Sequence, residues 1–595
     1  MYGKNTLIIP THKDVFGEVA KTEAQIIDGL KEFSNLTILH TCTKLMLFLN
    51  SAGAKRPDKQ TELAVGLLNQ ETRERLQAFI ENSDEDAPNI LIFHHCPVMM
   101  MVKLNLEHND ESGLEITTEE TRTKFASLLI SLSDIWLVDN RLKGGAGDKQ
   151  QRKYFIEGLR AYQARQFLQE NDSEPMINLL TRGRYFLDKA RADERLNFDD
   201  TFKAATGMEL ALYMDILLML TVQWTINVDT AKLDDISVRS VGEYFKHTTL
   251  KAEDIDKFLD IVGFRMNDYI ALNKAYLEMS GMTDDNHLAN FITFMKKPIL
   301  RYDDKFLCLS PNFLLLQLTE GPYNIVREAL KGTKEERILP IVWGDAYERY
   351  ALERLGATFG RTAHQKLKDK GSETIDALID LDDIVLLIEI KYHHWSFKAR
   401  ITGKRKDMHG YMDGIARYKP KKVELGKPKV DKKKGLGQIK QFIEKVDNGL
   451  TTAPVDISKK LLVPVLIVGE EYPVDPLNRQ LLEGFASSAG CLITKDKRIL
   501  PFVLLTSEEL ELIESLVEGI GLEGTKKLFM AYVMRFHPEH RDAGYVKRPT
   551  SFKNEVFNRK ISVPNNEFMK SQSKRYLDPV RKHFKTIKVK GLSRG

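Results

Sequence analysis

The sequence has few cysteines and no long apolar run, and these two absences exclude several classes of protein. Only four cysteines occur among 595 residues, too far apart for a CxxC zinc site or a disulfide framework, so we expect buried free thiols. They are Cys42, Cys96, Cys308 and Cys491. No apolar segment reaches the roughly 18 residues needed to cross a bilayer. The longest candidate, residues 208–222, carries Glu209 and Asp215, so we interpret it as a buried helix.

The N-terminal residues also lack the features of a secretory signal. Their apolar stretch is too short, and no small-residue cleavage site follows it. We therefore expect a cytosolic (cytoplasmic) protein that does not associate with a membrane. Hydrophobic residues make up 42% and charged residues 29% of the chain, which is typical of a folded globular protein.

Positive charge is scarce over most of the chain and concentrated in two segments. Residues 396–434 contain 14 Lys and Arg against 4 Asp and Glu, and residues 541–595 contain 15 against 4. Because the whole chain carries only +4, the remainder carries −17. An acidic body with two basic segments is typical of a protein that binds a polyanion at defined places. The alternative is a solubilising loop and a disordered basic tail.

The pattern of apolar residues predicts a multidomain α/β protein. Residues 1–145 alternate short apolar runs with helical stretches, which indicates a small α/β domain of unknown role. The runs interpreted as strands are residues 6–9, 36–40, 89–94 and 134–138. Residues 150–338 are predicted to be helical, with little strand signal. Residues 341–515 mix helices and strands around a basic insertion, 394–435, and residues 516–595 are predicted to form a helix and a basic tail.

Residues 374–391 predict a β-hairpin that carries charged side chains on one face. The only plausible two-residue turn is Asp382-Asp383, and this turn fixes a register in which paired residue numbers sum to 765. One face is then entirely apolar. On the other face, Asp376 lies across from Glu389, and Lys391 lies beside Glu389. Opposed carboxylates repel each other unless a cation lies between them, and two carboxylates with water and phosphate oxygens suit Mg²⁺ or Mn²⁺.

This arrangement of an Asp followed by Glu-x-Lys resembles the PD-(D/E)xK nuclease superfamily. The resemblance covers residues 341–515 and implies a restriction-endonuclease-like α/β/α core with a mixed sheet. It implies a metal site that includes Asp376 and Glu389, with Lys391 as a further catalytic residue. It also implies that Glu348, on the preceding helix, helps to bind the metal. The sequence departs from the motif at Ile375, where the motif has Pro.

The resemblance also points to residues after the hairpin that would contact substrate. Many relatives carry a Gln near the substrate on the next helix, and here Gln438 is the catalytic candidate and Gln441 a nucleic-acid contact. The basic insertion supplies further candidates for phosphate contacts. They are Lys398, Arg400, Lys404, Arg405, Lys406, Lys432, Lys433 and Lys434. A solvated, flexible loop is the alternative interpretation of this segment.

The sequence therefore predicts a metal-dependent nuclease, with DNA favoured over RNA as the substrate because most relatives cut DNA. The large N-terminal half resembles accessory regions of bacterial restriction and anti-phage defence nucleases, and a homo-oligomer or a partner protein bound through that half is left open. Four alternatives remain. They are a catalytically inert nuclease-fold protein that binds nucleic acid or acts as a scaffold, a DNA repair or recombination nuclease, a nuclease switched on only by a partner or phage product, and an ordinary surface hairpin with an Asp376–Lys391 salt bridge.

Overall fold

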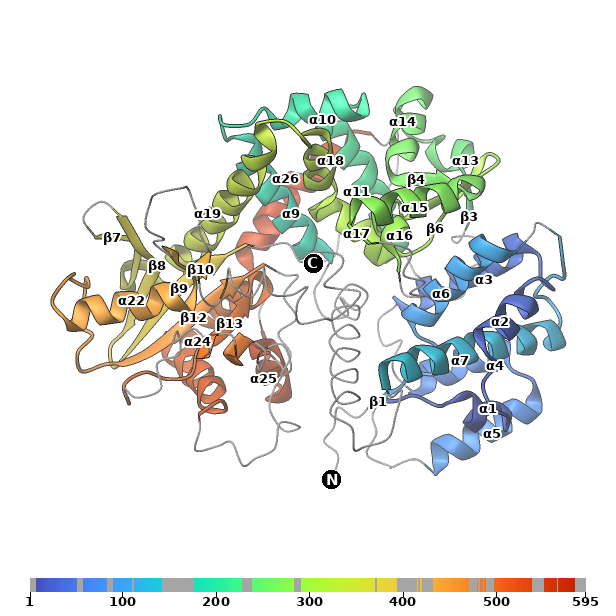
Figure 1. The fold of residues 1–595 in the computed structure, drawn as a ribbon, viewed down its shortest axis with the longest axis horizontal. Helices are drawn as coiled ribbons and strands as arrows, with labels where there is room; N and C mark the ends of the chain where they lie inside the picture. The colour runs from blue at the N-terminus through green and yellow to red at the C-terminus, as the bar shows by residue number, and fades with distance from the viewer. Residues whose placement is uncertain are drawn as a thin grey trace, which may run out of the picture. The chain divides into compact units, whose positions relative to one another are not determined.

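The computed structural model is mostly helical with two mixed sheets, and its contacts divide the chain into two compact units (Figure 1). The described residues are 7–50, 57–82, 89–109, 112–141, 176–226, 238–282, 290–369, 372–392, 415, 418–419, 432–469, 479, 482–484, 486–487, 497–537, 551–563 and 566–583. The first unit comprises residues 1–184, 198–329 and 574–595. The second comprises residues 185–197 and 330–573. The predicted four-part linear division stays a prediction.

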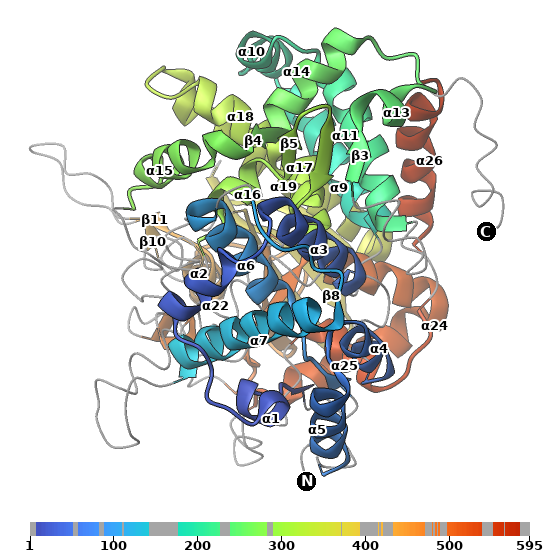
Figure 2. The same ribbon diagram turned by 90° about the vertical axis from the view of Figure 1, so that its right-hand side faces the viewer.

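The N-terminal part of the first unit is almost entirely helical. Its one strand pair is short and parallel: β1 (Leu7–Ile8) pairs with β2 (Asn89–Ile90) in the described residues. The helices are α1 (His12–Phe16), α2 (Glu23–Leu30), α3 (Asn35–Leu49), α4 (Pro57–Leu67), α5 (Gln70–Glu81), α6 (His95–His108) and α7 (Glu119–Arg141). The strands predicted at residues 36–40 and 134–138 are wrong, because these runs lie within α3 and α7. Helix α7 contacts α1, α2, α4 and α6 (Figure 2).

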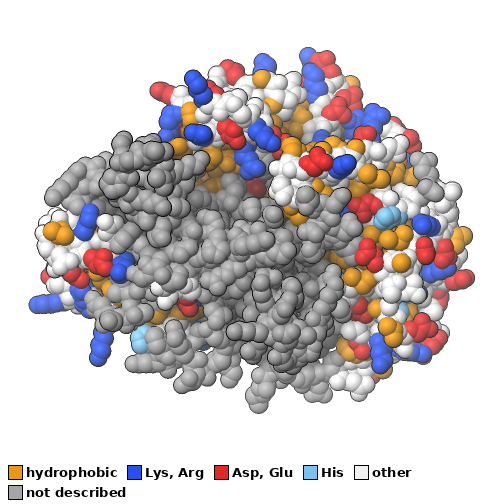
Figure 3. All heavy atoms as spheres, in the orientation of Figure 1, with side chains coloured by type: hydrophobic (Ala, Val, Ile, Leu, Met, Phe, Trp, Pro, Cys, Tyr) orange, Lys and Arg blue, Asp and Glu red, His pale blue; other side chains and the backbone are white. Residues whose placement is uncertain are grey.

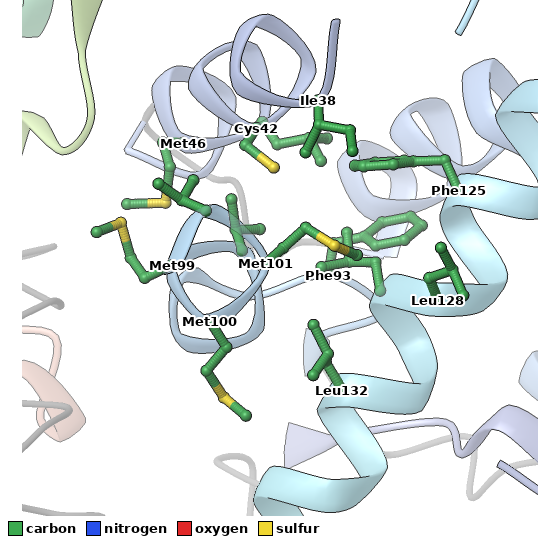
Figure 4. Close-up of a cluster of buried hydrophobic side chains, with 14 of the residues drawn as sticks. Ile38, Cys42, Met46, Phe93, Met99, Met100, Met101, Phe125, Leu128 and Leu132 are labelled. Carbon is green, nitrogen blue, oxygen red and sulfur yellow. The ribbon is translucent and has the colours of Figure 1, made fainter. Parts of the chain in front are cut away.

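A methionine-rich core holds these helices together. Met99, Met100 and Met101 of α6 are buried, and α3 contributes Cys42 and Met46 to the same core (Figure 4). Successive residues of α6 can all be buried because the helix is covered on several sides, by α3 and α7 among others. Unbranched methionine side chains suit such a core because they adapt to irregular gaps.

Three of the four cysteines are described, and all three are buried thiols, as predicted. Burial raises the pKa of Cys42 and of Cys308 above the ordinary range of a thiol, so both stay protonated at neutral pH. Cys96 is buried as well. Cys491 lies outside the described residues.

The middle of the chain contains a sheet that was not predicted. Strands β3 (Val238–Ser240), β4 (Gly263–Arg265), β5 (Ile299–Tyr302) and β6 (Lys305–Cys308) form it in the order β3-β6-β5-β4. The helices of this part of the chain are α9 (Met176–Arg191), whose residues from 185 on belong to the second unit, α10 (Phe198–Thr206), α11 (Leu210–Ile226), α13 (Val241–Phe245), α14 (Ala252–Val262), α15 (Tyr269–Met279), α16 (Ile292–Lys296), α17 (Pro311–Thr319) and α18 (Gly321–Ala329). The prediction that residues 150–338 are entirely helical is therefore wrong. Strands of three or four residues are too short for a clear period-two pattern.

The apolar segment near residue 215 forms a buried helix, as predicted. Asp215 lies within α11, where Arg184 Nη2 donates a hydrogen bond of 2.9 Å to its carboxylate. Among the described residues, no single helix has the length and apolar character to cross a membrane. Residues 198–206 and 210–221 pass that test only as a pair, and the pair is bent by 70°.

The second unit is built on a five-stranded mixed sheet. Its strands are β7 (Ala363–Asp369), β8 (Ser372–Leu381), β9 (Ile384–Lys391), β12 (Leu461–Val468) and β13 (Val503–Thr506), in the order β13-β12-β9-β8-β7. Strands β7, β8 and β9 are antiparallel neighbours, whereas β12 runs parallel to β9 and to β13. The helices are α19 (Leu339–Phe359), α22 (Leu436–Asp447), α24 (Ser507–Met534), α25 (Phe552–Asn558) and α26 (Glu567–Arg581), of which the last continues into residues of the first unit.

Helices cover both faces of this sheet. Leu355 of α19 and Ile513 of α24 line a small apolar space with Ile379 of β8 and Leu386 of β9, so the odd face of β8 is turned toward these two helices. Helix α22 contacts β8, β9 and β12, and because the odd face is already occupied it covers the other face (Figure 1). Helix α24 begins with a capping box, in which the Thr506 hydroxyl accepts a hydrogen bond from the backbone N–H of Glu509 and the Glu509 side chain accepts one from that of Thr506.

Candidate active site

The hairpin of β8 and β9 has the predicted register. Its paired residues include Ala377 with Ile388 and Leu381 with Ile384, and each pair sums to 765. The turn is Asp382-Asp383, and Asp382 adopts a positive φ of 67°, a conformation that Asp tolerates better than most residues. Lys526 secures the turn by donating a 2.8 Å hydrogen bond to the carbonyl oxygen of Leu381.

Asp376, Glu389 and Lys391 come together on the face of the hairpin that α22 covers. Lys391 Nζ lies 2.5 Å from Glu389 Oε2 and 3.4 Å from Asp376 Oδ2. Asp376 Oδ2 also accepts a 2.6 Å hydrogen bond from the backbone N–H of Ile390, so the carboxylate is held by the neighbouring strand. The three side chains therefore lie on one face, as the register predicts.

The Glu389 carboxylate is the most unusual group in this cluster. Glu389 is completely buried, and Asp376 is only 4% exposed. Apart from the ion pair with Lys391, neither oxygen of Glu389 accepts a hydrogen bond from the described residues. A buried carboxylate without donors costs free energy, so it is kept where another partner compensates for it.

Burial dominates the electrostatics of the cluster. The pKa of Glu389 is raised to about 8, mainly by burial; the nearby Asp376 acts in the same direction, while Lys391 and Lys434 oppose the shift. Burial alone would lower the pKa of Lys391, but the charges of Glu389 and Asp376 together raise it above its usual value. The lysine is therefore a permanent cation, whereas the glutamate can hold or release a proton near neutral pH.

Glu348 lies on α19, near the carboxyl ends of β9 and β12. The adjacent residue, Tyr347, donates a 2.7 Å hydrogen bond to the carbonyl oxygen of Val468, which pairs with Lys391 in the sheet. Glu348 itself is partly buried. Among the described residues, no group of three or more His, Cys, Asp or Glu side chains is placed to hold a metal ion. The participation of Glu348 in a metal site therefore stays a prediction.

Helix α22 carries the two predicted glutamines. Gln438 is partly buried, and its Oε1 is buried without a hydrogen-bond partner among the described residues, whereas Gln441 is exposed. Lys434, just before the helix, is near enough to Glu389 to lower its pKa. Lys432 and Lys433 form β11, which pairs with β10 (Tyr418–Lys419).

Most of the predicted basic insertion lies outside the described residues. The candidate phosphate contacts in that part are Lys398, Arg400, Lys404, Arg405 and Lys406. Where the surface is described, basic and acidic side chains are interspersed on the face that Figure 3 shows. Lys434 is a predicted basic contact whose side chain is described, and its charge lowers the pKa of Glu389.

The chain was compared with protein-family models, with curated proteins and with solved structures. None of the three comparisons found a match.

An aromatic support beside the cluster was not predicted from the sequence. The ring of Tyr392, directly after Lys391, lies 5.0 Å from the ring of Tyr347, and a side chain added at Gly469 would meet Tyr392. Ser507 donates a 3.1 Å hydrogen bond to the Tyr347 hydroxyl, so α19, β9, β12 and α24 meet here. The tyrosine after Glu-x-Lys was visible in the sequence, but its contact with α19 depends on tertiary packing.

Proposed function

We propose that the second unit is a metal-dependent nuclease whose active site contains Asp376, Glu389 and Lys391. The observation that carries this proposal is the buried Glu389 carboxylate, which has no hydrogen-bond donor among the described residues beyond its ion pair and lies beside a second carboxylate and a lysine. Perturbed ionisable groups gathered in this way are typical of functional sites. The alternative of a surface hairpin with an ordinary salt bridge fits poorly with the burial of both carboxylates.

The available oxygens fit a divalent cation. Asp376 uses Oδ2 for the Ile390 amide, and apart from the ion pair of Oε2 with Lys391 neither Glu389 oxygen has a hydrogen bond from the described residues, so carboxylate oxygens remain available as hard ligands. Asp376 and Glu389 would hold Mg²⁺ or Mn²⁺, with Glu348 as a further candidate ligand. When bound, the ion supplies Lewis-acid polarisation of a phosphate and a lower pKa for a coordinated water.

The remaining chemistry belongs to the residues of this chain. Lys391 is a permanent cation held by Glu389, Asp376 and the carbonyl oxygen of Ile390, at 3.1 Å in the last case. From this position its ammonium can orient an attacking water or stabilise negative charge that develops on the phosphate. Gln438, on the helix above the same face, offers a side-chain oxygen that has no partner among the described residues.

The order of elements supports the same assignment. A helix, α19, precedes the hairpin, and the strand that ends at Lys391 is followed by α22 and by the parallel strand β12. This is the order that the resemblance to PD-(D/E)xK nucleases implies. A substrate of DNA is favoured over RNA only through that resemblance.

The test is a cleavage assay with purified full-length protein on single- and double-stranded DNA and on RNA, with Mg²⁺, Mn²⁺ or EDTA. We expect cleavage that requires the cation and falls by at least about 100-fold in Asp376→Ala and Lys391→Ala. Asp380→Asn is the matched control, because Asp380 lies on the same strand but pairs with Lys460 at 2.6 Å. Its activity should match that of the parent protein.

Two results would contradict the proposal. Cleavage that persists in both Asp376→Ala and Lys391→Ala would place the active site elsewhere. Cation-independent binding of DNA or RNA, without cleavage under any condition, would favour the inert nucleic-acid-binding alternative.

A further inference from the structure

The N-terminal part of the first unit contains a pocket that the proposed nuclease function does not use. Its volume is about 690 Å³, within the range of small-molecule sites. Residues from α1, α2 and α7 line it, together with loop residues between these helices. Phe16, Ser127 and Leu128 are among them, so the wall is partly apolar with a hydroxyl group at one point.

The hydroxyl of Ser127 is hydrogen-bonded to a buried histidine. Ser127 Oγ lies 2.9 Å from Nε2 of His12, and Nδ1 of the same ring lies 3.1 Å from the carbonyl oxygen of Glu18. A carbonyl oxygen only accepts, so Nδ1 must carry a proton. In the neutral ring, Nε2 is then an acceptor, and Ser127 donates its proton to it. A nucleophile, a base and a group that orients the base are thus present.

Helix α7 fixes the position of this histidine. Asp134 Oδ2 accepts a 2.8 Å hydrogen bond from the backbone N–H of His12, and Ser131 Oγ accepts one of 3.1 Å from the backbone N–H of Lys21. Ser127, Ser131 and Asp134 are spaced at i, i+4 and i+7, so they share one face of the helix. Phe16 stacks on the His12 ring at 4.6 Å and restricts its rotation.

A second hydroxyl lies one helical turn before Ser127. Thr123 lines the pocket, and its Oγ1 is buried without a hydrogen-bond partner among the described residues. An unsatisfied hydroxyl at this position can donate a hydrogen bond to an oxygen of a bound molecule. A bound ligand with an oxygen atom would accept this hydrogen bond and so offset the free-energy cost of burying the Thr123 hydroxyl without a partner.

The charges that line the pocket indicate the class of ligand. Four of the lining side chains are acidic and two are basic. One of the basic residues, Lys124, is already ion-paired with Glu32. An anionic ligand would therefore be repelled, whereas a neutral or cationic molecule would be accepted.

We propose that this pocket is a second active site, in which Ser127 is the nucleophile and His12 the general base for hydrolysis of a small neutral or cationic carboxylic ester. Ser127 Oγ forms a bond to the carbonyl carbon while its proton passes to His12 Nε2. The bond from that carbon to the alcohol oxygen breaks, and the alcohol leaves with the proton. Water, deprotonated by His12, then cleaves the acyl-serine and regenerates both residues.

The same helix provides an internal control for this proposal. Ser133 Oγ lies 2.8 Å from Nε2 of His94, so α7 carries two Ser–His pairs. Ser133 and His94 are 1% and 4% exposed, and neither lines the pocket. Both pairs have a Ser–His hydrogen bond, but of the two serines only Ser127 lines the pocket. Comparing the two serines therefore shows whether labelling requires access to the pocket or follows from the hydrogen bond alone.

The experiment labels the full-length protein with a fluorophosphonate and locates the adduct by mass spectrometry. Phosphonylation forms the Oγ–P bond and expels fluoride, with the serine proton passing to His12. We expect one adduct, on Ser127. Labelling should fall at least about tenfold in Ser127→Ala and in His12→Gln, and it should be unchanged in Ser133→Ala. Hydrolysis of p-nitrophenyl acetate should follow the same order.

Two further variants keep the result interpretable. Asp380→Asn should label normally, because Asp380 belongs to the other unit and pairs there with Lys460. If Ser127→Ala or His12→Gln does not fold, the thiols of Ser127→Cys and Ser133→Cys are compared by alkylation with iodoacetamide, and Ser127→Cys should react at least about tenfold faster. Equal alkylation of the two thiols, equal labelling of Ser127→Ala and Ser133→Ala, or no adduct on Ser127 in the parent protein overturns the proposal.

Discussion

At the scale of single residues, Glu389 is a buried carboxylate where a neutral amide of the same shape would cost less. It is fully buried, and burial raises its pKa to about 8. We expect Glu389→Gln to keep or raise the free energy of unfolding at pH 8 without divalent cations, by about 1 kcal/mol, because one of two neighbouring buried carboxylates is removed while Asp376 stays beside Lys391. On the proposed function, the same variant should lose at least about 100-fold in nuclease activity, since Glu389 is one of the two proposed metal ligands of the hairpin. Urea denaturation and cleavage assays measure the two effects.

Asp380→Asn is the control for this pair of measurements. Its ion pair with Lys460 is about one-fifth exposed, so its loss should cost at most about 1 kcal/mol and leave activity intact. A strong destabilisation by Glu389→Gln with retained cleavage would show that the carboxylate is structural.

Two buried tyrosines offer a second residue-scale prediction. The Tyr347 hydroxyl donates to Val468 at 2.7 Å and accepts from Ser507 at 3.1 Å, whereas the Tyr532 hydroxyl has no hydrogen-bond partner among the described residues. Tyr347→Phe should destabilise the second unit by about 1 to 2 kcal/mol, because the Val468 carbonyl is left unsatisfied. Tyr532→Phe should be neutral or slightly stabilising. Urea denaturation measures the free energy of unfolding of each variant, and hydrogen exchange of the β12 amides shows whether a loss lies in the second unit. Equal losses of stability in the two variants would contradict this prediction.

At the scale of elements, periodicity predicts the hairpin well and the short strands poorly. The hairpin was readable because its turn and its alternating residues, from Asp376 to Lys391, admit a single register. The run at residues 36–40 was not readable, because a five-residue segment with three apolar positions fits a strand or a buried helix equally well. Its assignment depends on α3 being covered on several sides, as the burial of both Ile38 and Leu39 shows. Tertiary packing therefore decided what the local pattern left open.

The stability of the first turn of α24 is expected to depend on pH. Glu509 accepts 3.0 Å hydrogen bonds from the backbone N–H groups of Thr506 and Lys553, yet burial raises its pKa to about 7. Between about pH 4.5 and 7 the folded form keeps a proton that the unfolded form has released. The free energy of opening α24 should therefore fall as pH rises through this window.

Glu509→Gln should flatten that pH dependence, because no proton can bind at the amide. Hydrogen exchange of the α24 amides, corrected for the intrinsic rate at each pH, measures it. Thr506→Ala is the control: it removes the N-cap hydroxyl and should cost about 1 kcal/mol at every pH without changing the slope. A slope that survives in Glu509→Gln would assign the effect to another group.

At the scale of the whole molecule, the units are not continuous in sequence. Residues 185–197 belong to the second unit, although residues 1–184 and 198–329 belong to the first. Domain boundaries predicted from the linear sequence cannot reveal this exchange of residues 185–197 into the second unit, because the apolar pattern of α9 is the same whichever unit the helix packs against. The exchange depends on contacts between residues far apart in sequence, such as Arg195 with Asp345 at 2.6 Å.

This exchange predicts that a simple C-terminal fragment is incomplete. Fragment 330–573 lacks Phe186, whose ring lies 5.5 Å from Tyr347 and 4.9 Å from Tyr350. A synthetic peptide of residues 176–198 should therefore bind the fragment and raise its melting temperature by roughly 5 to 10 °C at a hundredfold excess over Kd. Differential scanning fluorimetry with increasing peptide measures the shift.

Two peptide variants decide whether the aromatic contact is responsible. Phe186→Ala should abolish most of the shift, because it removes a large apolar side chain that is 6% exposed. Arg191→Ala should preserve it, since Arg191 pairs with Asp188 of the same helix at 3.7 Å. Equal shifts with both variants would mean that the peptide binds without the packing of α9 on α19. A fragment that is fully stable alone would show that residues 185–197 are dispensable to the second unit.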